Sequence, residues 1–178
     1  KIFHHKPFRD IYRLMPNPIP TASLKRRFAS LMYEGLLTSA VTAIAGVIAG
    51  MIAVILNQTG LTAFSSPIVS VLLLAAWWFY FKANWNKKGQ TLPMQVWKIG
   101  LANAKGNRPP LPQLRLRFMW ACVFLVFIPI LAYAGLQHND IPPKAAAGAA
   151  LLWWILPWGF AFFNRDRQFL YDYLAGTR

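Results

Sequence analysis

The sequence predicts an all-α, polytopic membrane protein with four transmembrane helices, both termini in the cytoplasm, and a short interfacial helix in the middle loop. Two observations lead to this prediction. Four apolar runs each have about the ~20 residues needed to cross a hydrocarbon core of ~30 Å. Nearly all Lys and Arg residues lie in three of the five segments around these runs, with Lys144 as the exception, and the positive-inside rule places those three segments in the cytoplasm. The runs cover residues 28–56, 64–81, 118–136 and 145–163.

The composition excludes an ordinary soluble domain. Of the 178 residues, 56% are hydrophobic, and the predicted spans are apolar on all sides, as a helix in lipid is. In hydrocarbon a helix pairs its own backbone groups. The net charge of +14 suggests nucleic acid, but the cations flank the apolar runs and no base-reading motif is present. We expect them to contact anionic lipid headgroups, at about 1 kcal/mol each, and we expect no nucleic-acid partner.

The first 27 residues form a cytoplasmic or interfacial arm in this prediction. The arm is basic and aromatic, and Pro16, Pro18 and Pro20 exclude a regular helix in its centre. It has no apolar core of a signal peptide. Thr21 or Ser23 would cap the first helix, which we expect to begin near Leu24.

Small residues line one face of the first span. Gly35, Ser39 and Ala43 recur every four residues, and Gly46 and Gly50 form a GxxxG pair. Small residues at this spacing allow a second helix to approach closely. Two interpretations follow: packing within a four-helix bundle, or a seam between two copies of the chain.

The loop over residues 82–117 is the largest segment outside the spans. It follows the aromatic end of the second span, where Lys82 would anchor the helix at the interface. Residues 94–104 are amphipathic, with Pro93 suited to a first helical turn, so we expect an interfacial helix there. Prolines 109, 110 and 112 would end regular structure before the third span.

The second pair of spans contains a proline in each helix. Pro129 and Pro157 each remove one hydrogen bond of the helical ladder, so we expect both spans to kink. The outer loops, residues 57–63 and 137–144, are short, and a cytoplasmic tail covers 164–178. The two hairpins share no clear sequence pattern, so we predict no internal repeat.

Glu34 is the residue of the first span that most suggests chemistry. It lies about two turns inside the helix, where a charge costs ~2.5–3.5 kcal/mol near the bilayer centre and is usually paired or functional. Arg27 lies seven residues earlier, on roughly the same face. Glu34 is therefore either a proton or cation site, or a carboxylate that pairs with Arg or Lys from a neighbouring helix end.

We expect no catalytic residues, metal or cofactor, and hence no enzyme. His4 and His5 lie in the arm and His138 in an outer loop, so they cannot share a metal in this topology. Cys122, the one cysteine, lies within the third span and is interpreted as apolar filling. No phosphate-binding glycine loop is present.

Three stretches together resemble the RDD family of small bacterial integral membrane proteins. They are RRFASLMYE at 26–34, GQTLPM at 89–94 followed by WKI at 97–99, and RDRQFLYDYLAGTR at 165–178. The resemblance runs from Arg27 to the end of the chain. It implies that Arg27 is the family's arginine and Asp172 its second aspartate, while Glu34 stands at the position of the first aspartate.

The resemblance also implies a multi-pass protein of the bacterial cytoplasmic (inner) membrane, and Na⁺/H⁺ exchange in some members. We hypothesise that Arg27, Glu34 and Asp172 form one charge cluster in the cytoplasmic half, because a carboxylate at low dielectric needs a partner. The expected function is a non-enzymatic accessory or structural subunit that packs against other membrane proteins or against itself. The alternative is a small oligomeric cation/proton antiporter with Glu34 as its titrating site.

Overall fold

The computed structural model describes residues 21–178, except for the side chains of residues 86–88. The predicted arm therefore lies outside the described residues up to position 20. The described chain folds into helices joined by turns and divides into two compact units. We call Lys25–Ile99 the N-terminal unit, and Gly100–Arg178, with the described residues before Lys25, the C-terminal unit.

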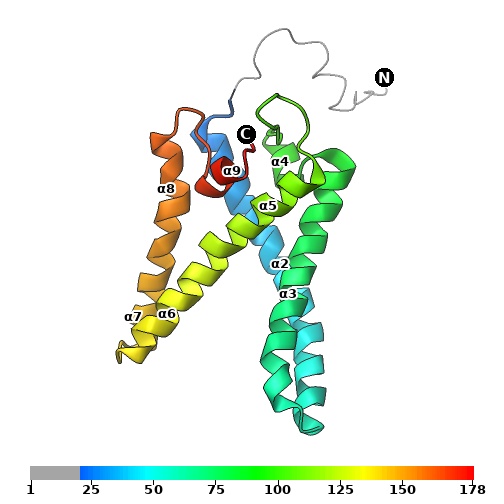
Figure 1. Ribbon diagram of the computed structural model, residues 1–178, viewed down its shortest axis with the longest axis vertical. Coiled ribbons are helices and arrows are strands. Elements are labelled where there is room, and N and C mark those ends of the chain that lie inside the picture. Colours follow the sequence, from blue (N-terminus) through cyan, green and yellow to red (C-terminus); the bar gives the residue numbers. More distant parts are fainter. Residues whose placement is uncertain (1–20) are drawn as a thin grey trace. The chain divides into compact units, whose positions relative to one another are not determined.

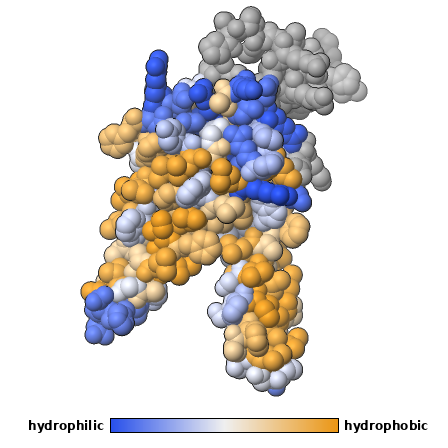
Figure 2. Space-filling view, in the orientation of Figure 1, coloured by the Kyte–Doolittle hydropathy of each residue, from blue (hydrophilic) through white to orange (hydrophobic). Residues whose placement is uncertain are grey.

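The all-α prediction with four candidate spans is confirmed. Within residues 21–178, four helices are long and apolar enough to cross a membrane. Figure 2 shows hydrophobic residues along the visible length of these helices and hydrophilic residues near their ends. Large apolar side chains such as Leu36, Ile44 and Leu131 are exposed, as expected for helices surrounded by lipid. The four helices are Leu24–Gln58, Thr62–Trp85, Leu111–His138 and Pro143–Phe163.

The N-terminal unit is a helical hairpin closed by a short helix. Helix α2 (Leu24–Gln58) begins at the predicted residue and runs antiparallel to α3 (Thr62–Lys88) (Figure 1). Gly60 has a φ of 80° in the turn between them, a conformation that glycine adopts without steric cost. The five-residue helix α4 (Leu92–Val96) follows.

Helix α4 is shorter than the predicted interfacial helix and begins earlier. Pro93 lies in its first turn, as predicted, because the missing proline N–H has no helical acceptor there. The helix ends at Val96, and Lys98 then adopts a φ of 52°, which stops the helical path before the predicted end at residue 104. The interfacial position of this segment stays a prediction.

The C-terminal unit contains a second pair of candidate spans and a short final helix. The pair meets at the turn between α6 and α7, and its arms diverge from there, with α9 lying between α5 and α8 (Figure 1). The third span consists of α5 (Leu111–Cys122), the π-helical segment η1 (Val123–Phe127) and α6 (Ile128–His138). The fourth consists of α7 (Pro143–Leu151), the 3₁₀ segment η2 (Leu152–Trp154) and α8 (Ile155–Phe163), and α9 covers Leu170–Leu174.

Pro129 and Pro157, the two prolines that we expected to kink their spans, each follow a change of helix type. Segment η1 precedes Pro129 and η2 precedes Pro157. Leu125 lies four residues before Pro129, so its carbonyl is the one whose α-helical donor the proline lacks. The indole Nε1 of Trp154 donates to that carbonyl at 3.0 Å. A side chain of the fourth span thus replaces a backbone hydrogen bond of the third.

Candidate functional site

The N-terminal unit holds Glu34 between hydroxyl groups from two other segments. The Tyr80 hydroxyl, on α3, donates to Oε1 of Glu34 at 2.9 Å. The Thr91 hydroxyl, from the turn before α4, donates to Oε2, and Thr91 is completely buried. Each carboxylate oxygen therefore has a neutral donor, and hydrogen bonds to a charged acceptor are stronger than those between neutral groups.

A polar row continues from Glu34 along the face of α2 that meets α3. Thr38 donates to the Glu34 carbonyl at 2.8 Å, and Thr42 donates to the Thr38 carbonyl at 2.7 Å. The Trp77 indole then donates to the Thr42 hydroxyl at 2.8 Å. The spacing of four residues keeps all three on one helix face. Tyr80 and Trp77 thus link α3 to two levels of this row.

The residues of the GQTLPM stretch present Thr91 to Glu34. Gly89 ends α3 in a left-handed conformation, with its N–H donating to the Trp85 carbonyl. The buried Gln90 side chain donates to the Ile99 carbonyl at 2.7 Å. Because Gln90 closes the segment from inside, the Thr91 hydroxyl is held against α2 rather than capping α4, for which no side-chain cap bond is formed.

The two arginines at the start of α2 have different environments. The Arg26 guanidinium donates through Nε to the Trp97 carbonyl at 2.8 Å and through Nη2 to the Lys98 carbonyl at 2.7 Å. It therefore satisfies carbonyls at the C-terminal end of α4. Arg27 is buried, with 8% of its surface exposed, which is unusual for an arginine.

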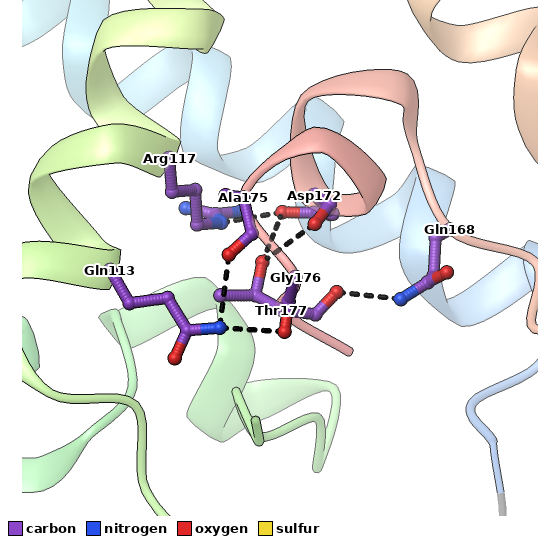
Figure 3. A network of polar contacts seen from close by, with 7 residues as sticks. All are labelled: Gln113, Arg117, Gln168, Asp172, Ala175, Gly176 and Thr177. Carbon is purple, nitrogen blue, oxygen red and sulfur yellow. Dashed lines mark hydrogen bonds and ion pairs between the residues drawn. The ribbon is translucent and has the colours of Figure 1, made fainter. Parts of the chain in front are cut away.

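The C-terminal unit contains a buried ion pair (Figure 3). Nε of Arg117 on α5 lies 2.5 Å from Oδ1 of Asp172 on α9, and their side chains are 11% and 6% exposed. The guanidinium also lies over the Tyr171 ring, 5.5 Å from its centroid, within range of a cation–π contact. This pair joins the final short helix to the start of the third span.

The sequence after Asp172 folds into a helix-ending turn that side chains hold in place. The Thr177 N–H donates to the Asp172 carbonyl at 2.9 Å and the Gly176 N–H to the Tyr173 carbonyl at 3.0 Å, with Gly176 at a φ of 66°. These two bonds define a Schellman motif. Gln113 donates to the Ala175 and Gly176 carbonyls, and Gln168 donates to the Thr177 carbonyl at 2.7 Å (Figure 3).

The three residues of the predicted charge cluster lie in two units. Arg27 and Glu34 belong to the N-terminal unit, and Asp172 belongs to the C-terminal unit. The single cluster of all three therefore stays a prediction. Arg117, the ion-pair partner of Asp172, was not among our sequence candidates.

Arg117 was missed because we placed it in the loop over 82–117. Helix α5 begins at Leu111 with Pro112 in its first turn, where proline starts a helix instead of ending one. A reading of Pro112 as a helix start would have put Gln113 and Arg117 one turn apart on the same face.

Three small residues of α2 lie one position after the members of the polar row, whereas Gly46 and Gly50 continue the row's spacing of four. Gly35, Ser39 and Ala43 are exposed. A Cβ added at Gly35, Gly46 or Gly50 would meet no described atom within 4 Å. Within the N-terminal unit, α3 therefore does not pack closely against these glycines.

The described residues contain no group of three His, Cys, Asp or Glu side chains that could hold a metal ion. His4 and His5 lie outside the described residues. Our expectations of no metal, cofactor or catalytic set stay predictions.

Four apolar helices with polar ends define the class of multi-pass helical membrane proteins. The family model of the RDD family matches residues 21–176. The chain therefore belongs to the RDD family, as the three sequence stretches indicated. No match was found among curated proteins or among solved structures.

Proposed function

We propose that the protein is a non-enzymatic accessory or structural subunit that packs through α2 against another membrane protein or a second copy of itself. The observation that carries this proposal is the open row of Gly35, Ser39 and Ala43, which α3 does not cover. Helices in lipid associate where small side chains let their backbones approach. A helix surrounded only by lipid would gain no packing stability from such a row.

We further propose that it resides in the bacterial inner membrane with both termini in the cytoplasm. The support is the charge at one end of the N-terminal hairpin, where Lys25, Arg26 and Arg27 begin α2 and Lys82 lies near the end of α3. The opposite turn, residues 57–63, has no charge. Cysteines placed at Gln58 and Lys105 test the orientation: an impermeant maleimide added outside intact cells should label the first and spare the second.

Site-directed crosslinking in native membranes tests the packing surface. In a Cys122→Ser background, Ser39→Cys is compared with Ile44→Cys, which is also exposed but lies about 140° further around the helix. We expect a short crosslinker to join Ser39→Cys to a second copy or to one defined protein, and Ile44→Cys to give no such product. Equal crosslinking at both positions, or none at either, would contradict the proposal.

A cation/proton antiporter is the second candidate, and the surroundings of Glu34 favour it. A carboxylate inside a candidate span receives two neutral hydroxyl donors, from Tyr80 and Thr91. Oxygen atoms of this kind suit both a proton and a hard cation. The row through Thr38 and Thr42 adds polar groups deeper in the same helix interface.

Reconstitution separates the two candidates. The purified protein in liposomes is tested for Na⁺- or K⁺-driven proton flux, alongside Glu34→Gln and the control Asp166→Asn. Flux that the control keeps and Glu34→Gln loses would establish the antiporter and reject the accessory subunit. Absence of flux from a protein that carries a defined partner would support the subunit.

A further inference from the structure

Two short segments, one in each unit, have the same backbone hydrogen bonds in the same order. We call residues 89–99 the first clasp and residues 167–177 the second clasp. Each consists of three residues without regular secondary structure, a five-residue helix and a turn, and each residue of the first has its counterpart 78 positions later. The helices correspond end to end, Leu92–Val96 with Leu170–Leu174.

Four backbone hydrogen bonds match between the clasps. In the first clasp the donors Gln95, Trp97, Lys98 and Ile99 reach the carbonyls of Thr91, Pro93, Gln95 and Met94 at 3.0, 3.0, 3.1 and 2.8 Å. In the second the donors Tyr173, Ala175, Gly176 and Thr177 reach Phe169, Tyr171, Tyr173 and Asp172 at 3.0, 3.2, 3.0 and 2.9 Å. The match includes the bond from the last residue to the carbonyl five positions earlier, which closes each helix.

The left-handed backbone positions also match. Gly89 and Arg167 open the clasps with φ of 69° and 53°, and Lys98 and Gly176 close them with φ of 52° and 66°. Two of these residues are not glycine. Arginine and lysine pay a steric cost in this region, so the shared geometry is imposed by the clasp and not by the local sequence.

One side chain holds each clasp from inside. Gln90 donates to the Ile99 carbonyl and Gln168 to the Thr177 carbonyl, each at 2.7 Å and each across nine residues. Both glutamines are buried. Together with Leu92 and Leu170 they are identical residues at matched positions.

The first helix of each unit supplies a second matched donor. Arg26 donates to the Trp97 and Lys98 carbonyls, and Gln113 donates to the matched Ala175 and Gly176 carbonyls. Arg26 is the third residue of α2, and Gln113 is the third residue of α5. The third residue of the first helix therefore donates to the carbonyls at the C-terminal end of the clasp in both units.

We propose that residues 24–99 and 111–177 are two copies of one membrane module, and that Gln90 and Gln168 are equivalent positioning residues. Each module has two candidate spans and a clasp that returns to the start of its own first helix. The proposal departs from our sequence prediction of no internal repeat, because few side chains are shared between the two modules. The repeat resides in hydrogen bonds and backbone conformation.

The two modules differ where charge is involved. Glu34 and Thr91 interact in the first module. When the first residues of α2 and α5 are aligned, Ala121 stands at the position of Glu34, and Phe169 stands at the position of Thr91 in the second clasp. In the second module Arg117 pairs with Asp172, and the matched positions hold Ser30 and Met94. Each polar pair therefore belongs to one module alone, and the clasp geometry requires neither of them.

Hydrogen–deuterium exchange on the full-length protein in nanodiscs tests the equivalence. Gln90→Leu should speed exchange of the amides of residues 95–99 about fivefold and leave residues 173–177 unchanged. Gln168→Leu should do the reverse. Gln58→Leu, at an exposed position, is the control and should alter neither. A variant that loosens both clasps equally, or that leaves its own clasp unchanged, would overturn the proposal.

A substitution taken from one module into the other tests the matched donor without removing a core side chain. Arg26→Gln carries the residue found at Gln113 and should keep slow exchange in the first clasp, whereas Arg26→Leu should speed it. If Arg26→Gln exchanges as fast as Arg26→Leu, the two helix positions are not equivalent and the proposal fails. This arm stays informative if the Gln90 and Gln168 variants do not fold.

Discussion

Arg117 and Asp172 form an ion pair that is buried in the C-terminal unit. Their 2.5 Å contact joins residues 55 positions apart in the sequence and fixes α9 against the third span. A longer ion pair, between Arg178 and Asp166 at 3.5 Å, has side chains that are 50% and 33% exposed. The two pairs therefore offer an internal comparison between a buried and a solvated interaction.

Loss of Asp172 should destabilise the protein much more than loss of Asp166. Asp172→Asn removes the carboxylate from the buried pair with Arg117, and breaking a buried pair costs about 3–5 kcal/mol. Asp166→Asn breaks an exposed pair that contributes about 0–1 kcal/mol. Thermal unfolding of both variants in the same detergent measures the difference. Equal melting temperatures would show that the buried pair is not a stabilising element.

The bond between Trp154 and the Leu125 carbonyl should matter only while Pro129 is present. Trp154→Phe should cost about 1–2 kcal/mol in the natural sequence, because the carbonyl loses its donor. In a Pro129→Ala background the restored backbone N–H can replace that donor, so the same substitution should cost less. A double-mutant cycle of unfolding free energies measures this coupling. Additive effects would mean that the indole does not compensate for the proline.

Replacement of Lys98 by glycine should stabilise the N-terminal unit. Lys98 has a φ of 52°, which costs a non-glycine residue roughly 1–2 kcal/mol. Part of that gain is lost because glycine makes the unfolded chain more flexible. We expect Lys98→Gly to raise the melting temperature and Lys105→Gly, at an exposed position outside the left-handed region, to lower it slightly.

The hydroxyl donors to Glu34 should contribute separately to stability. Thr91→Val removes a fully buried hydroxyl and keeps its shape, and Tyr80→Phe removes the other donor. Hydrogen bonds to charged groups contribute about 1.5–3 kcal/mol each, so each variant should unfold at a lower temperature. Neither should matter in a Glu34→Ala background. A full effect of Thr91→Val in that background would show that Thr91 acts through packing alone.

Loss of Arg27 should destabilise the protein more than loss of an exposed cation. It is buried, and the hypothesis of a cluster with Glu34 and Asp172 gives it carboxylate partners. Arg27→Ala should therefore lower the melting temperature in detergent by several degrees more than Lys105→Ala, whose side chain is exposed. Similar melting temperatures of the two variants would count against the cluster.

The spans could be predicted because their signal is local. A run of apolar residues and a cap identify a helix within a few positions, and the start of α2 at Leu24 was predicted correctly. The start of α5 was placed seven residues late, at 118, because Pro112 can end one helix or begin another. The end of α4 at Val96 depends on the left-handed Lys98, which residue type does not reveal.

The partners within the site could not be predicted, because they lie far apart in the sequence. Glu34 is 46 residues from Tyr80 and 57 from Thr91. The sequence around a threonine before a helix does not show whether its hydroxyl caps that helix or donates to a distant carboxylate. The sequence could indicate that Glu34 needs partners, since its position in an apolar helix requires them, but it could not identify them.

Gln90 and Gln168 each bind a carbonyl only nine residues away, which affects the order in which the chain folds. Contacts between nearby residues form faster than contacts between distant ones. The hydrogen bonds described above for the first clasp lie within residues 89–99 or join it to Arg26 and Glu34. All of its parts have been synthesised before residue 100 is added. The N-terminal unit can therefore close while the third span is still being translated, and the second clasp repeats the step about eighty residues later.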